Sequence, residues 1–199
     1  MIYKIIDLKC PGCGEPVKTD ERNCKYCGRQ VIISSFNSVY DMSLQDLNKY
    51  TNTYKKALNE SPDNVELNCS IGMCYLRLKL YDKAYESFEK AIEENFDNSE
   101  IYFYAAVSLL KGKKAFLARK ADIDKAIELT NAALMIENRG IYNYFIAYLK
   151  YDFYSRKSLN VFPNYIEELI NARDNSVTVN DIENLFNLLG VTLPEELVI

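Results

Sequence analysis

Four cysteines near the N-terminus are the residues best suited to chemistry in this 199-residue chain. Cys10-Pro-Gly-Cys13-Gly is followed by Cys24-Lys-Tyr-Cys27-Gly, with ten residues between Cys13 and Cys24. Two thiolates separated by two residues can face one ion, and the glycine after each pair permits the positive φ of a tight turn. Two such turns supply four soft ligands, which predicts a tetrahedral site for one structural Zn²⁺ ion at Cys10, Cys13, Cys24 and Cys27.

The sequence around these cysteines resembles a short zinc ribbon over residues 3–34. Its flanks, Tyr3–Leu8 and Gln30–Ile33, fit short strands. Rubredoxins, which bind iron, share the paired turns but space them much further apart, and two redox disulfides are a further interpretation. About 30 residues bury too little apolar surface to fold alone, so we expect the metal to hold this segment together. Four cysteines leave no open position for catalysis.

Composition excludes several classes of function. The chain has no histidine, which rules out histidine acid–base catalysis and Cys-His or Ser-His pairs. Cys69 and Cys74 lie within one expected helix and are interpreted as buried thiols, so we predict that the protein is not an enzyme. A net charge of −4 argues against a general polyanion binder. No apolar run approaches the roughly 20 residues that span a bilayer, so we expect a cytoplasmic protein without membrane contact.

The elements behind the ribbon are predicted to be helical. Two amphipathic helices, about Asn64–Leu78 and Tyr81–Asn95, form a unit of 34 residues. This unit resembles the tetratricopeptide repeat family, which has the same period. The matching positions are Ile71, Gly72, Tyr75, Ala84, Phe88 and Ala91. Asn68 replaces the family's usual tryptophan and Phe96 its terminal proline.

The resemblance extends over about residues 43–173. Ser43 is predicted to cap a preceding helix, and a second unit starts at Ser99 with eight extra residues. A third unit has helices at about Arg139–Tyr154 and Asn164–Arg173, and a last helix, about Asn180–Leu189, ends at Gly190. The resemblance implies a mainly α array of antiparallel helical hairpins, an α-solenoid, preceded by a small β ribbon. We expect a ribbon at 1–36, a linker at 37–42 and a repeat domain with C-terminal capping helices at 43–199.

In the tetratricopeptide family, the first helices of the repeats line a groove that binds protein segments. The groove positions of this chain would be apolar and aromatic: Met73, Phe103, Val107, Leu110, Tyr144, Tyr148 and Tyr151. The three tyrosines follow a spacing of four and then three residues, so they share one helix face. The resemblance therefore implies a protein-binding scaffold. Alternatively, these tyrosines pack as ordinary core beneath the C-terminal helices.

A cationic stretch provides a second candidate site. Ten residues contain five cations and no acid: Lys111, Lys113, Lys114, Arg119 and Lys120. On a helix, part of this stretch would form a basic face that could meet phosphate. Residues 1–36 carry six cations and four anions, so the ribbon and this stretch together make a nucleic-acid-associated regulator the alternative function. A solvated helix face is the simpler explanation.

Overall fold

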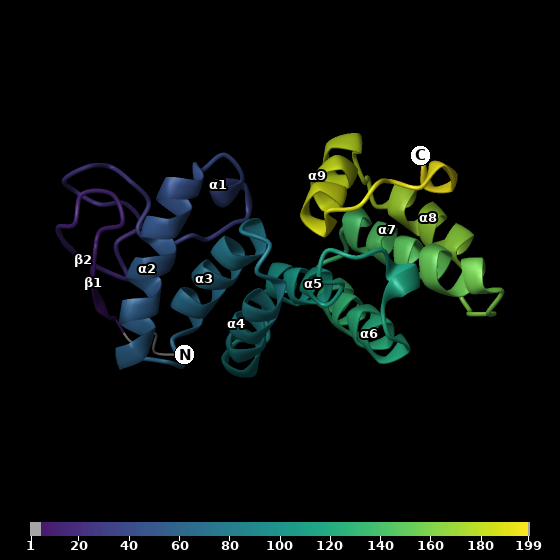
Figure 1. Ribbon diagram of the computed structural model, residues 1–199, viewed down its shortest axis with the longest axis horizontal. Coiled ribbons are helices and arrows are strands. Elements are labelled where there is room, and N and C mark those ends of the chain that lie inside the picture. The colour runs from purple at the N-terminus through teal and green to yellow at the C-terminus, as the bar shows by residue number, and fades with distance from the viewer. Residues whose placement is uncertain (1–4, 199) are drawn as a thin grey trace. The chain divides into compact units, whose positions relative to one another are not determined.

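The computed structural model describes residues 5–198, so Tyr3 and Lys4 of the expected ribbon lie outside the described residues. The chain divides into two compact units, one ending at Phe96 and the other beginning at Asp97 (Figure 1). Within residues 5–198, none of the helices has the length and apolar character needed to cross a membrane. The two units are described separately.

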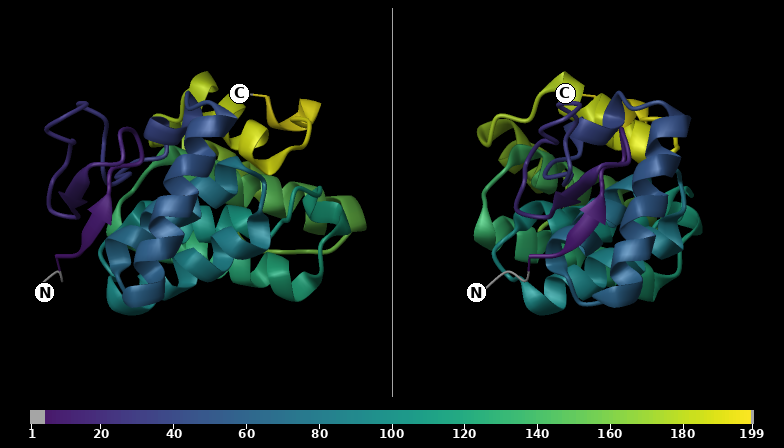
Figure 2. Two further views of the ribbon diagram at one scale, coloured as in Figure 1. Left: turned by 60° about the vertical axis from the view of Figure 1, so that its left-hand side comes forward. Right: turned by 90° about the vertical axis from the view of Figure 1, so that its left-hand side faces the viewer.

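The first unit combines a two-stranded sheet with helices. β1 (Asp7–Lys9) pairs antiparallel with β2 (Pro16–Lys18). The helices of this unit are α1 (Asn37–Tyr40), α2 (Leu44–Glu60), α3 (Val65–Arg77) and α4 (Tyr81–Glu94). α3 packs on α4 as a hairpin, α2 packs on α3, and β1 contacts α2. Figure 2 shows the purple strands lying beside α2. The bounds of α3 and α4 agree with the expected ones to within one residue at each end.

The helices of the first unit begin where side chains can satisfy free backbone N–H groups. The Asp46 N–H donates to Ser43 Oγ at 3.1 Å, which confirms Ser43 as the cap of α2. The Leu67 N–H donates to Asn64 Oδ1 at 2.9 Å at the start of α3. Such caps fix the first turn of a helix because its N–H groups have no partner within the helix.

The segment 37–42, which was predicted as a linker, contains α1 and buries Val39 completely. One expectation for the first unit was wrong. Gln30–Ile33 does not continue as a strand beyond a single bridge between Asn23 and Gln30. Its carbonyl groups accept hydrogen bonds from helix side chains instead, as described below.

The second unit is built from two helical hairpins and a further helix. Its elements are α5 (Ser99–Ser108), α6 (Lys120–Ile136), α7 (Gly140–Leu149), α8 (Tyr165–Asp174) and α9 (Val179–Leu189). α5 packs on α6 and α7 packs on α8, while α9 contacts both α5 and α7. A π-helical turn, Lys150–Tyr154, continues α7, and short 3₁₀ turns cover Ala115–Leu117, Ser155–Lys157 and Glu195–Leu197.

Caps again define the helices of the second unit. Asn164 and Thr178 each form a capping box with the acid three residues later, at the starts of α8 and α9. Gly190 ends α9 with a φ of +67°, a conformation that glycine adopts without steric cost. The predicted fold class, a mainly helical array of hairpins preceded by a small β ribbon, is confirmed.

Candidate functional site

The two cysteine turns have the same backbone geometry. In the first, the Cys10 N–H donates to the Glu15 carbonyl at 2.8 Å and the Gly14 N–H donates to the Cys10 carbonyl at 2.9 Å. The second turn, starting at Cys24, repeats both bonds at 2.8 Å. Gly14 and Gly28 have φ values of +83° and +72°, as the sequence predicted for these positions. The turns therefore present their thiols in equivalent ways.

Both turns bring their sulfurs together at one place. The four Sγ atoms lie within 4.8 Å of one another. Cys10 Sγ is 3.5 Å from Cys27 Sγ, and Cys13 Sγ is 3.7 Å from Cys24 Sγ. Four sulfurs held tetrahedrally at about 2.3 Å from one Zn²⁺ ion are separated by roughly 3.8 Å. The donor set thus fits a single four-coordinate ion.

The thiols of the two turns differ in their pKa. Desolvation raises the pKa of Cys24, but hydrogen bonds from the backbone of Cys27 and Tyr26 outweigh it and lower the pKa to about 7. The pKa of Cys13 is instead raised to about 12: its backbone bond at Glu15 opposes the rise, which desolvation and the neighbouring thiols cause. A metal ion binds cysteines as thiolates, so binding at this cluster would release the proton of Cys13.

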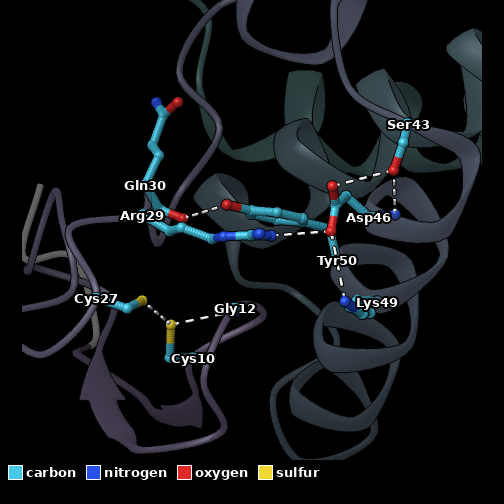
Figure 3. Close-up of polar contacts among 9 residues, drawn as sticks. All are labelled: Cys10, Gly12, Cys27, Arg29, Gln30, Ser43, Asp46, Lys49 and Tyr50. Atoms are coloured by element: carbon cyan, nitrogen blue, oxygen red, sulfur yellow. Dashed lines mark hydrogen bonds and ion pairs between the residues drawn. The ribbon is translucent and has the colours of Figure 1, made fainter.

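Two hydrogen bonds connect the residues after the second cysteine turn to α2 (Figure 3). The Arg29 guanidinium donates to the Asp46 carboxylate at 2.8 Å, and the Tyr50 hydroxyl donates to the Gln30 carbonyl at 2.6 Å. The Arg29 side chain crosses Gly12, where a Cβ atom would lie 2.5 Å from Arg29 Cδ. Gly12 thus allows Arg29 to pass over the first turn and reach the helix.

The segment after the ribbon is held in the same way. The Tyr54 hydroxyl donates to the Val31 carbonyl at 2.8 Å, and the Ser70 hydroxyl donates to the Ile33 carbonyl at 3.0 Å. Val31 and Ile33 are buried. These bonds satisfy carbonyl groups that a third strand would otherwise have paired. The ribbon and α2–α3 consequently share one core.

The remaining cysteines, Cys69 and Cys74, belong to that core. Both are buried in α3, and burial raises the pKa of each thiol to about 12. A thiol with such a pKa is almost fully protonated at neutral pH and a poor nucleophile. The interpretation of these two cysteines as apolar core residues is confirmed.

Most of the predicted groove residues lie beneath other side chains. Those with almost no exposed surface are Met73, Phe103, Val107, Leu110, Tyr144 and Tyr148, and only Tyr151 is half-buried. Phe103 on α5 stacks against α7, with its ring 4.8 Å from that of Tyr142 and 5.7 Å from that of Phe145. Partner binding by these residues stays a prediction, and it would require access to a surface that is covered in this conformation.

The C-terminal elements provide this cover. The Phe186 ring of α9 lies 5.1 Å from the Tyr148 ring and 6.5 Å from the Tyr144 ring, edge to face in both cases. The Tyr144 hydroxyl donates to the Leu197 carbonyl at 2.6 Å. Tyr144 and Tyr148 therefore pack as core residues beneath the C-terminal elements in this structure, as the alternative interpretation predicted.

The cationic stretch does not form the helix that the basic-face hypothesis required. Lys111 and Gly112 have φ values of +51° and +71°, and α6 begins only at Lys120. Arg119 pairs with Asp122 at 2.7 Å, and Lys120 pairs with Asp124 at 2.6 Å. Lys113 and Lys114 are exposed. The helical face was a wrong expectation, and nucleic-acid binding by the five cations stays a prediction.

Sequence inspection missed the contacts that join these elements. Tyr50 and Tyr54 on α2 and Leu197 near the C-terminus were not among the predicted site residues. Tyr50 and Tyr54 are four residues apart, so they lie on the same face of α2. This spacing could have indicated that their hydroxyl groups bond to a neighbouring segment.

The fold and the site together define a protein of helical-hairpin repeats with an attached four-cysteine ribbon. Residues 65–98, which contain α3 and α4, match the tetratricopeptide repeat family. This match falls where the sequence indicated a repeat, and the predicted resemblance is confirmed over these residues.

Known proteins also show similarity to parts of this chain. The BBSome complex member BBS4 of Bos taurus is 49% identical over 41 residues, a stretch that covers 21% of this chain and 8% of BBS4. The crystal structure of MamA has a TM-score of 0.55 at 19% identity and covers 71% of this chain and 78% of MamA. Another MamA structure, MamA AMB-1 in crystal form P212121, has a TM-score of 0.52 at 21% identity, with coverages of 73% and 82%. At these identities the MamA structures establish a common fold alone.

Proposed function

We propose that this protein is a non-enzymatic interaction protein. It binds a partner segment along the tyrosine face of α7, and one structural zinc ion holds its ribbon. A tetratricopeptide repeat within a helical-hairpin fold is typical of a protein-interaction scaffold. The observation that carries the proposal is a run of three tyrosines along one helical segment, with Tyr144 and Tyr148 on α7 and Tyr151 on the π-helical turn that continues it. Tyrosine combines a large apolar ring with a polar tip, which suits a surface that recognises a peptide.

A zinc ion at the four cysteines would have a structural role. The cysteines fill all four tetrahedral positions, so no position is open for water or substrate. The sulfur separations of 3.5 and 3.7 Å support one ion, which would cross-link the two turns. Elemental analysis of the purified chain tests the identity of the metal. One zinc per chain is expected, and a chain that retains iron instead, or no metal after reconstitution, would contradict the assignment.

The partner surface is tested with a residue that is accessible. Tyr151 is half-buried, whereas truncation of Phe103 or Tyr148 would open a cavity in the core. We expect affinity purification from the native host to recover a partner with the wild-type chain and to lose it with Tyr151→Ala. The control is Tyr26→Ala, because Tyr26 is exposed on the ribbon. A partner that is retained equally by all three proteins would exclude the tyrosine face as its binding surface.

A further inference from the structure

The last residues of the described chain run back along α7. Gly190 ends α9 and turns the chain, and residues 192–198 then return beside α7 (yellow in Figure 1). Leu197 is completely buried, and its carbonyl accepts the hydrogen bond from Tyr144. We call residues 192–198 the tail. The tail thus covers part of the surface that the proposed function assigns to a partner.

The tail combines a buried apolar residue with an acidic one, and a 3₁₀ turn at Glu195–Leu197 presents them. Glu196, Tyr151 and Arg156 line one cavity, and the Tyr151 hydroxyl, a backbone bond and the charge of Arg156 lower the pKa of Glu196. The two tail residues therefore meet positions that are seven residues apart. The Leu197 carbonyl bonds to Tyr144 of α7, and Glu196 shares a cavity with Tyr151 of the π-helical turn that continues α7. Recognition by a buried anchor with a charged neighbour is the pattern of a peptide in a helical groove.

The fit of the tail is incomplete. A cavity of about 280 Å³ lies beside it, lined by Lys114, Tyr148, Tyr151, Asp152, Arg156, Thr192, Leu193, Pro194 and Glu196. The backbone bonds within the tail are local, from Leu197 to Pro194 and from Val198 to Glu195. A segment fixed by few side chains next to a cavity opens at a lower free energy than the packed helices.

We propose that the tail is an intramolecular occupant of the partner site, and that a partner segment of similar chemistry replaces it. The replacing segment is short and carries acidic residues between apolar ones, as in the tail's own Leu-Pro-Glu-Glu-Leu. The apolar anchor takes the place of Leu197, and an acid faces Tyr151 and the cations Arg156 and Lys114. This inference rests on the proposed function.

The experiment measures binding of a fluorescent peptide with the sequence of residues 190–198 to the full-length chain. In Leu197→Asp, a bound tail would bury an unpaired negative charge. Because this is costly, we expect the tail to leave the surface of α7. We expect the peptide to bind this variant at least about tenfold more tightly than the wild type, because a tethered competitor acts at an effective concentration of about a millimolar. Val198→Asp is the control: Val198 is 65% exposed, so this variant should behave as the wild type.

A milder variant keeps the test valid if the aspartate disturbs folding. Leu197→Ala removes most of the anchor without adding a charge, and it should give a smaller gain in peptide affinity. A peptide whose own leucine at 197 is replaced by aspartate should bind at least about tenfold more weakly. Equal peptide affinity for the wild type and both Leu197 variants, with circular dichroism unchanged, would overturn the inference. If partner capture still depends on Tyr151 in that case, the proposed function stands without it.

Discussion

Cys24 is one of two buried thiols among the four candidate ligands, so its loss affects both the metal and the fold of the ribbon. We expect Cys24→Ser to reduce the metal content from one ion per chain to nearly none. Binding of a structural zinc contributes on the order of 10 kcal/mol to the folding of small metal-dependent modules, so the ribbon should lose its order. Elemental analysis and amide hydrogen exchange of residues 5–34 measure the two effects.

Cys74→Ala provides the matched control for this prediction. Cys74 is also buried, but it lies in α3 and away from the four-sulfur cluster. This variant should keep one ion per chain while losing some stability. Full metal occupancy in Cys24→Ser would contradict the four-cysteine site.

Lys150 and Glu168 form an ion pair inside the second unit. Their charged atoms are 2.6 Å apart, and the side chains are only 6% and 9% exposed. We expect Lys150→Met to destabilise the chain by roughly 3 kcal/mol, because it leaves a buried carboxylate without its partner. Urea unfolding followed by circular dichroism measures the change.

Two further variants distinguish a buried unpaired charge from simple loss of a contact. In Lys150→Met combined with Glu168→Leu, most of the stability should return, since no charge is left unpaired. Lys120→Met breaks the exposed pair with Asp124 and should cost less than about 1 kcal/mol. Equal losses of stability in Lys150→Met and Lys120→Met would show that burial does not increase the contribution of the Lys150–Glu168 pair to stability.

Among the elements, the α3–α4 hairpin depends on a close approach at Gly72. A Cβ atom there would lie 2.7 Å from Cε1 of Phe88, whose side chain is fully buried. Alanine at an exposed helix position stabilises by about 0.5–1 kcal/mol relative to glycine. Here we expect Gly72→Ala to destabilise by about 1–3 kcal/mol, because overpacking outweighs the gain in helix propensity.

A double variant tests whether Phe88 is the cause. Combining Gly72→Ala with Phe88→Leu should cost less than the sum of the two single substitutions, since the smaller side chain relieves the clash. Thermal unfolding of the four proteins gives this coupling. Strictly additive losses would place the strain elsewhere in the hairpin.

The sequence predicted the helices well because their ends carry local signals. Ser43, Asn64 and Gly190 act through bonds or φ values within a few residues, so their effect can be inferred without tertiary information. The four cysteines could likewise be assigned to one centre from their spacing. The cover over the tyrosine face could be named only as an alternative, because the contact that decides it joins Tyr144 to Leu197 across 53 residues of chain.

The prediction that the cationic stretch forms a helix was wrong because of the local backbone conformation. Its seven positions from Lys111 to Leu117 turn through two residues of positive φ and a 3₁₀ segment before α6 begins. The pattern of charges contained no information about this turn, although Gly112 was a signal for a break. Charge runs predict solvation more reliably than they predict the shape of the backbone that carries them.

At the scale of the whole molecule, the ribbon is an integral part of the first unit. Buried hydroxyl groups of Tyr54 and Ser70 donate to carbonyl groups at 31 and 33, directly after the second cysteine turn. If removal of the metal disorders the ribbon, these hydroxyl groups lose their acceptors, at a cost of about 1–3 kcal/mol each. We therefore expect a chelator to accelerate amide exchange at least about tenfold in α2 and α3, beyond the ribbon itself.

Hydrogen exchange followed by mass spectrometry measures this effect in the full-length chain with and without the chelator. Peptides from α7 and α8 serve as the internal reference, because the four cysteine ligands all lie in the first unit. Tyr54→Phe, studied with the metal bound, should reproduce part of the acceleration in α2 because it removes one of the same bonds. Fast exchange confined to residues 5–30 after chelation would mean that the helices hold their structure without the ribbon. Acceleration in α2 and α3 would instead establish that the cysteine site stabilises the repeat, so that loss of metal would alter the helical part of the first unit as well.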